Sequence, residues 1–216
     1  MNVNPSFRNA LYLITDRHQV PEGKTLLEVI EQALIGGVRL IQLREKDLTA
    51  AELWPLAQNL RALTNRFSAK LFVNDRIDVA LACDADGIHL GGHSLPIATT
   101  RKLIGRDRLI GVSTHSLSEA LIATEQGADF ITFGPILNTP SKSEYGPPLG
   151  YGMIEQACQE TPLPVLALGG IKNEHIEPIM SRGASGISLI SGIISSIDPQ
   201  SAARQLTQLV QQSSTQ

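Results

Sequence analysis

A polar loop between two apolar segments carries side chains that suit an anion. It spans residues 133–150 and holds Thr139, Ser141 and Lys142 close together, with four prolines. Hydroxyl groups beside a lysine offer hydrogen-bond donors and one positive charge, which is what a phosphate group requires. Loops of this length inside a compact domain are usually functional. The loop therefore predicts an anion site, although a solvated surface loop with a stray lysine has the same composition.

Polar residues also follow an apolar run at residues 38–43. Gln42, Arg44 and Lys46 stand at every second position there. If the run is a strand that continues, this spacing directs all three side chains to the same side. Two cations on one side of a strand end suit a strongly anionic ligand.

The next apolar run, residues 70–73, ends in Asn74 and Asp75. Magnesium commonly bridges one or two protein carboxylates and the phosphates of a substrate. Asp75 is therefore a candidate Mg²⁺ ligand. The alternative is that Asp75 caps a helix that begins near Ile77.

Glycines follow two runs near the end of the chain, Gly169 and Gly170 after residues 164–168 and Gly192 after residues 186–190. Glycines let backbone amides approach an anion closely, and a helix start adds positive potential. Their joint placement favours a phosphorylated ligand.

Other polar residues at run ends are His93 and Ser94, and Ser113 and His115. His115 precedes a helix start, so we expect it to hydrogen-bond locally. His89 lies within an apolar run, which favours an orienting or core role over a catalytic one. His93 is left open as a candidate proton carrier.

Eight short apolar runs, each followed by a helix-period segment, must position these residues. None alternates cleanly between polar and apolar residues, as expected when both faces of a parallel sheet are buried. Eight such units favour a (β/α)8 TIM barrel, an α/β fold, as one domain over residues 1–216. A doubly wound open sheet is the alternative, but no glycine-rich fingerprint follows the first run. The expected strands are residues 10–15, 38–43, 70–73, 87–90, 109–112, 130–133, 164–168 and 186–190.

Start signals mark several helices. Thr25 is a plausible N-cap, and Thr49 with Glu52 and Ser116 with Glu119 have the spacing of capping boxes. The last helix is expected over about residues 199–211, followed by a polar tail. In a barrel the active site forms where strands end, which is where the polar residues above collect.

Composition narrows the class of protein. The 216 residues carry a net charge of −3, which gives no support for a nucleic-acid partner. Cys83 and Cys158 fit neither a disulfide framework nor a zinc pattern, which favours the reducing cytoplasm. No segment reads as a signal peptide or as the ~20 apolar residues of a membrane helix, so no membrane partner is expected.

Taken together, the chain resembles the thiamine phosphate synthase family and its relatives, the TenI thiazole tautomerases. The resemblance runs nearly end to end. It rests on the motifs YLITDR (12–17), QLREK (42–46), NDRIDVAL (74–81), ADGIHLG (85–91), GVSTHS (111–116), GADFITFGPI (127–136), TPSK (139–142) and ALGGI (167–171).

The resemblance implies a (β/α)8 barrel that acts as a transferase on two small phosphorylated substrates. Hydroxymethylpyrimidine pyrophosphate loses pyrophosphate, and the nitrogen of a thiazole phosphate attacks the resulting methylene to give thiamine phosphate. The cofactor implied is Mg²⁺.

The resemblance also assigns roles to positions in this chain. Those matching the pyrophosphate site are Arg44, Lys46, Asn74 and Lys142; Asp75 matches a magnesium ligand; Gln42 and Ser113 match positions near the pyrimidine; and Thr139, Ser141, Gly170, Ile190 and Ser191 match positions near the thiazole phosphate. Of these, Arg44, Lys46, Lys142 and Ser113 are the expected catalytic residues.

Two positions depart from the family patterns. Ser94 stands where synthases carry a second metal-binding aspartate, and a neutral hydroxyl is a poor substitute for a carboxylate. Pro135 stands where the tautomerase type carries a histidine, so that activity would need another proton carrier, for which His93 is the candidate. A synthase is the main hypothesis. A tautomerase and a non-catalytic ligand-binding protein are the alternatives, and a homodimer through outer helices is compatible with the fold.

Overall fold

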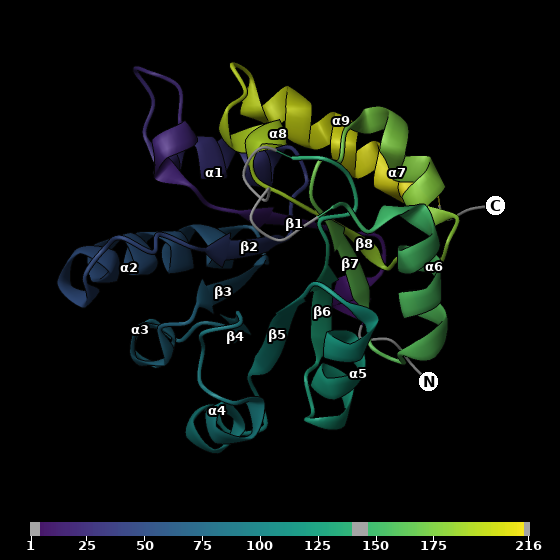
Figure 1. Cartoon of the computed structure of the whole chain (residues 1–216). Helices are drawn as coiled ribbons and strands as arrows, with labels where there is room; N and C mark the ends of the chain where they lie inside the picture. The colour runs from purple at the N-terminus through teal and green to yellow at the C-terminus, as the bar shows by residue number, and fades with distance from the viewer. Residues whose placement is uncertain (1–4, 140–146, 214–216) are drawn as a thin grey trace.

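The computed structural model describes residues 5–139 and 147–213, and these contain eight parallel strands that close into a barrel in chain order. Figure 1 shows the strands at the centre of the molecule with helices around them. The (β/α)8 barrel predicted from the sequence is thus confirmed. The strands are β1 (Ala10–Ile14), β2 (Leu40–Leu43), β3 (Lys70–Asn74), β4 (Gly87–Leu90), β5 (Leu109–Thr114), β6 (Phe130–Phe133), β7 (Val165–Leu168) and β8 (Gly186–Leu189).

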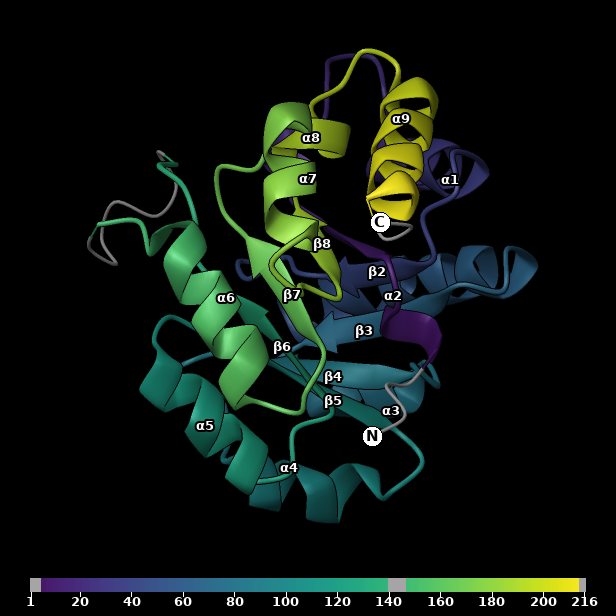
Figure 2. The ribbon, with the colours of Figure 1, turned by 90° about the vertical axis from the view of Figure 1, so that its right-hand side faces the viewer.

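Helices cover the outside of the barrel. The last one, α9, packs against α1 and α7 and so covers the seam where β8 meets β1 (Figure 2). No helix in the described ranges has the length and apolar character needed to cross a membrane. The α-helices are α1 (Leu26–Ile35), α2 (Ala50–Arg66), α3 (Ile77–Ala82), α4 (Ile97–Ile104), α5 (Leu117–Glu125), α6 (Gly150–Glu160), α7 (Asn173–Met180), α8 (Ser191–Ile194) and α9 (Pro199–Gln212), and the 3-10 helices are η1 (Pro5–Phe7) and η2 (Arg17–Gln19).

Two strand boundaries differ from the prediction in ways that matter for the site. β5 continues past Val112 because Ser113 and Thr114 stay in register with Thr132 and Phe133 of β6. β3 continues to Asn74, which stays in register with His89 of β4. The polar side chains at these two ends are therefore held by strands and not by loops.

The helix-start signals are confirmed with one change. Thr49 and Glu52 form the expected capping box, and Thr25 forms one with Glu28. Ser116 caps α5, but the Glu119 carboxylate accepts its hydrogen bond from the backbone of His115 and not from Ser116. Glu119 thus ties down the last residue before the cap.

One end of the barrel interior is filled by apolar side chains. Phe7 from η1 enters it and stacks on Phe130, with ring centroids 4.4 Å apart. Tyr12 and Phe72 meet the same ring edge to face, at 5.6 and 5.2 Å between centroids. All four are fully buried. Inside the barrel, the space left for a ligand is consequently at the other end, where the strands finish.

Candidate functional site

A layer of polar side chains lies above this aromatic cluster. Leu40, Phe72 and Phe130 point into the interior, and side chains alternate along a strand. Two residues further on, Gln42, Asn74 and Thr132 therefore also face inward, nearer the strand ends. Period-two alternation thus places the predicted residues Gln42 and Asn74 inside the barrel mouth, and it adds Thr132, which the sequence reasoning missed.

Hydrogen bonds link five side chains of this region, each from a different strand. Gln42 Nε2 donates to Tyr12 Oη at 3.0 Å, and Tyr12 Oη lies 3.3 Å from His89 Nδ1. His89 Nε2 lies 3.0 Å from Ser113 Oγ, which also accepts from Thr132 Oγ1 at 3.4 Å. Gln42 and Ser113, both predicted near the pyrimidine, are therefore joined through Tyr12 and His89.

His89 is buried in the barrel and carries no charge at neutral pH. Burial, together with the positive charge of Arg44, lowers the pKa of His89 to about 3. Gly111 makes room for the imidazole, because a Cβ there would lie 2.7 Å from His89 Nδ1 and 2.2 Å from Phe130 Cζ. His89 is thus a buried, uncharged side chain within a strand, and the predicted orienting or core role stays a prediction.

Arg44 and Lys46 follow β2, which ends at Leu43, and so lie in the loop after the strand. The backbone N–H of Arg44 donates to the buried hydroxyl of Thr15 at 2.9 Å, which fixes the chain at that point. Desolvation and the charge of Arg44 lower the pKa of Lys46, against the opposing effect of the Asp75 carboxylate. Lys46 therefore lies in the field of both Arg44 and Asp75.

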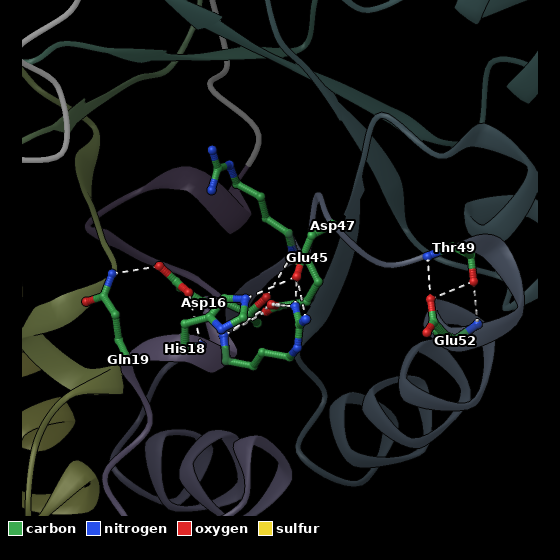
Figure 3. Close-up of polar contacts among 10 residues, drawn as sticks. Asp16, His18, Gln19, Glu45, Asp47, Thr49 and Glu52 are labelled. Atoms are coloured by element: carbon green, nitrogen blue, oxygen red, sulfur yellow. Dashed lines mark hydrogen bonds and ion pairs between the residues drawn. The ribbon is translucent and has the colours of Figure 1, made fainter.

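Glu45 and Asp47, which alternate with Arg44 and Lys46, anchor this segment to the loop after β1 (Figure 3). The buried carboxylate of Glu45 accepts the backbone N–H of Arg17 at 3.1 and 3.2 Å and its guanidinium Nη1 at 3.2 Å. The same guanidinium pairs with Asp47, at 2.6 Å from Nη1 to Oδ1, and His18 Nε2 lies 3.1 Å from Asp47 Oδ2. The Arg17 pairing lowers the pKa of Asp47. We name Arg17, Glu45 and Asp47 the β1–β2 clamp.

Asp75 ends β3 with a strained backbone and a carboxylate available to a ligand. Its φ is 65°, in the left-handed region, and its backbone N–H donates to His89 O at 3.0 Å. The alternative cap role is wrong, since α3 has Arg76 at its N-cap and no side-chain capping bond. Within the part of the chain that the structure describes, the Asp75 carboxylate makes no hydrogen bond.

Ser94 is engaged in its own turn. Its Oγ accepts the backbone N–H of Gly91 at 2.7 Å. The described residues hold no group of three or more His, Cys, Asp or Glu that could cage a metal ion. A metal at this end of the barrel would therefore depend on Asp75 and on a ligand that brings its own oxygens.

A cavity of about 460 Å³ opens between the ends of β7 and β8. Four of the predicted phosphate-site residues line it, namely Thr139, Gly170, Ile190 and Ser191. Gly170 has a φ of 69°, and a Cβ there would lie 2.6 Å from Asn138 O, so only glycine fits. The short helix α8 begins at Ser191, which the sequence did not predict; barrels often use such a helix for phosphate.

Lys172 also lines this cavity, and sequence reasoning missed it. Among the described residues that line the cavity, it is the only one with an ionisable side chain. Its position in the sequence could have identified it, because it stands two residues after Gly170, in the loop after the seventh predicted strand. The described lining of the cavity therefore carries one cationic side chain.

Two predicted site residues and two histidines remain to be placed. Ser141 and Lys142 lie outside the described residues. His115 Nδ1 lies 2.5 Å from Gly134 O, which confirms its local role. His93 is exposed in the loop between β4 and α4 and has no hydrogen bond within residues 5–139 and 147–213.

The family model and the most similar sequences reported below match the same protein family. The family model described as thiamine monophosphate synthase matches residues 11–193. A protein of Geobacter sulfurreducens is 53% identical over 201 residues, which are 93% of this chain and 94% of the relative. The thiamine-phosphate synthase of Chloroflexus aurantiacus is 42% identical over 93% of this chain and 92% of its own.

Solved structures show the same relationship. A thiamine phosphate pyrophosphorylase from Pyrococcus furiosus superposes with a TM-score of 0.87 at 34% identity, over 97% of this chain and 99% of that one. A 3-hexulose-6-phosphate synthase superposes with a TM-score of 0.69 at 18% identity, over 93% of this chain and 99% of that one, a likeness of fold alone.

Proposed function

This chain belongs to the thiamine monophosphate synthase family, and from that premise we propose that it is a transferase that makes thiamine phosphate. Its substrates would be hydroxymethylpyrimidine pyrophosphate and a thiazole phosphate. The observation that carries the proposal is the barrel mouth, where a polar layer and two cations in the loop after β2 stand beside a separate cavity at β7 and β8 whose described lining includes Lys172. Two anionic substrates can be held there at once.

In the proposed reaction, the bond between the pyrimidine methylene and the pyrophosphate oxygen breaks, and the oxygen keeps the electron pair. The thiazole nitrogen supplies the pair for the new C–N bond. Arg44, Lys46 and Asn74 would stabilise the charge that develops on the leaving pyrophosphate. Gln42 and Ser113 would hold the pyrimidine, and a mouth closed to water would protect its electron-poor methylene.

The thiazole phosphate would occupy the cavity between β7 and β8. The backbone amides near Gly170, Ile190 and Ser191, and the hydroxyls of Thr139 and Ser191, can donate to phosphate oxygens. Lys142 and Ser141, from the part of the loop that is not described, remain predicted partners of the pyrophosphate and of the thiazole phosphate.

Magnesium fits this site as an ion brought in by the pyrophosphate. Such ions usually take one or two carboxylates, substrate phosphates and water, and Asp75 offers one carboxylate without a competing hydrogen bond among the described residues. Bound there, the ion would neutralise charge on the leaving group. Ser94, whose Oγ accepts from Gly91, adds little.

Ser94→Asp tests this placement of magnesium. The carboxylate can accept the Gly91 N–H as the hydroxyl does and can add a second charged ligand. We expect the Mg²⁺ concentration for half-maximal rate to fall about 10-fold, because affinity rises with ligand charge. Ser118→Asp on the exposed face of α5 is the matched control. An unchanged Mg²⁺ dependence in Ser94→Asp would contradict the assignment.

The activity itself is tested with purified protein, both phosphorylated substrates and Mg²⁺. We expect thiamine phosphate and pyrophosphate in equal amounts, and a rate about 100-fold lower in Lys46→Ala. Lys102→Ala, on α4, should retain the wild-type rate. Absence of product at high enzyme concentration would refute the proposal. Aromatisation of the thiazole precursor alone would point to a tautomerase, and ligand binding without turnover to a binding protein.

We also propose a reducing compartment, the cytoplasm, and keep the homodimer as a prediction. Cys83 and Cys158 are free thiols, which supports a reducing environment. Sedimentation of the purified chain at several concentrations measures the assembly state directly.

A further inference from the structure

We propose that Tyr12 and His89 are positioning residues that make Ser113 a hydrogen-bond donor to a ring nitrogen of the pyrimidine. The inference rests on the proposed function and adds to it the direction of the hydrogen bonds in the polar layer. It concerns the chain of side chains Gln42–Tyr12–His89–Ser113, which crosses the interior from β2 to β5.

Gln42 sets the donor-to-acceptor direction of the first hydrogen bond in this series. Its amide nitrogen faces Tyr12 Oη at 3.0 Å, so the phenol oxygen accepts that bond. Among the described residues, the other hydrogen-bond partner of the phenol is His89 Nδ1 at 3.3 Å. Tyr12 is fully buried, and burial keeps its hydroxyl protonated by raising its pKa. The phenol proton therefore goes to His89 Nδ1.

The other protonation states of His89 do not fit these contacts. A proton on Nδ1, in the neutral ring or in the imidazolium, would point at a phenol oxygen that already accepts from Gln42. The phenol proton would then have no acceptor among the described residues, in a place that water does not reach. The proton of His89 consequently sits on Nε2 and is donated to Ser113 Oγ at 3.0 Å.

Ser113 is the last side chain in this hydrogen-bonded series. Its oxygen accepts from His89 Nε2 and, at 3.4 Å, from Thr132 Oγ1, which occupies both of its lone-pair directions. Its own proton is left for an acceptor that arrives from outside. A ring nitrogen of a pyrimidine is such an acceptor, and a ring that presents C–H or N–H there would lose the bond. Ser113 thereby selects the substrate by hydrogen-bond polarity.

Nitrogen-15 NMR of histidine-labelled protein tests the direction without any assay of activity. The two ring nitrogens of a neutral imidazole have distinct shifts according to which one carries the proton. We expect the His89 signal, assigned by its loss in His89→Gln, to report a proton on Nε2 at neutral pH. The signal of His18, whose side chain is 66% exposed, serves as a comparison from the protein surface. A proton on Nδ1, or a charged His89, would overturn the proposal.

A double-mutant cycle tests whether Tyr12 acts through Ser113. Tyr12→Phe removes one oxygen, and we expect kcat/KM for the pyrimidine pyrophosphate to fall about 10-fold, with KM for the thiazole phosphate unchanged. In a Ser113→Ala background the same change should cost nothing further. Equal losses in both backgrounds would show a merely structural role and overturn the proposal.

A pair of His89 variants separates positioning from packing. His89→Gln keeps an N–H donor on a flexible side chain and should recover part of the rate, whereas His89→Leu fills the space without a donor. Equal rates for the two would overturn the role of the Nε2 proton. A folded wild-type chain without turnover would refute the proposed function, and the NMR measurement would still decide the hydrogen-bond direction.

Discussion

Lys46 lies near two charges of opposite sign, Arg44 and Asp75, and their opposing effects contribute to its pKa. Desolvation and Arg44 lower its pKa, and Asp75 raises it by less. Lys46 therefore loses its proton at a lower pH than an ordinary lysine, whose pKa is about 10.4. Loss of that charge weakens the hold on pyrophosphate, so kcat/KM should fall on the alkaline side below the pH at which an exposed lysine titrates.

Lys46→Arg isolates this effect, because a guanidinium stays charged over the whole range. We expect the alkaline limb of the kcat/KM profile to move upward in pH, while Lys102→Arg leaves it in place. An alkaline limb at the same pH in Lys46→Arg and wild type would assign it to another group.

Lys172 should discriminate between a phosphate and an alcohol. It is the only ionisable side chain among the described residues of the β7–β8 cavity, so it supplies the charge that draws a dianion there. In Lys172→Gln we expect KM for the thiazole phosphate to rise about 10-fold, and the effect to shrink at high salt. Binding of the unphosphorylated thiazole alcohol should not change. Lys102→Gln is the control, and an equal shift there would contradict a local role.

At the scale of elements, β2 and the loop after β1 form one unit. Gln42 on β2 belongs to the interior polar layer, and Glu45, in the loop directly after the strand, belongs to the β1–β2 clamp. Glu45 accepts three hydrogen bonds from Arg17 with a side chain that is only 1% exposed. We therefore expect the direction of Arg44 and Lys46 to depend on the buried carboxylate of Glu45.

Glu45→Gln tests this dependence. The amide NH₂ would face the N–H groups of Arg17, and a buried donor without a partner costs about 1–3 kcal/mol of unfolding free energy. We expect a lower urea midpoint and also a lower kcat/KM at temperatures where the protein stays folded. Asp47→Asn, at the exposed end of the clamp, should change both less. A stability loss with unchanged kcat/KM would limit Glu45 to a structural role.

The elements were predictable because each rests on local signals: the apolar runs, and the caps at Thr25, Thr49 and Ser116. The expectation that a continuing strand would direct Gln42, Arg44 and Lys46 to the same side is not met beyond Gln42, because β2 ends at Leu43. The connection from Tyr12 to His89 was not predictable, because it joins residues 77 positions apart. The end of β5 was missed because the register with β6 holds it, and no signal within 109–114 does so.

For the whole molecule, residues that stabilise the fold and residues proposed to act on substrates lie toward opposite ends of the barrel axis. Phe7, Tyr12, Phe72 and Phe130 fill one end, and Tyr12 is also the lowest member of the polar layer at the other. Residues at the strand starts can therefore be changed at a cost in stability alone, whereas changes around Tyr12 reach the chemistry. This division is typical of barrels of this kind.

Phe7→Ala puts that division to the test. Phe7 is fully buried and stacks on Phe130, so its loss should lower the free energy of unfolding by about 3–5 kcal/mol. A domain with a typical stability of about 5–15 kcal/mol then remains folded at 25 °C. We expect a lower urea midpoint and an unchanged kcat/KM. Ile197→Ala, at a side chain 88% exposed, should alter neither. A fall in kcat/KM in Phe7→Ala under folding conditions would show that the aromatic cluster transmits strain through Tyr12 to Ser113, and the two ends of the barrel would then be coupled.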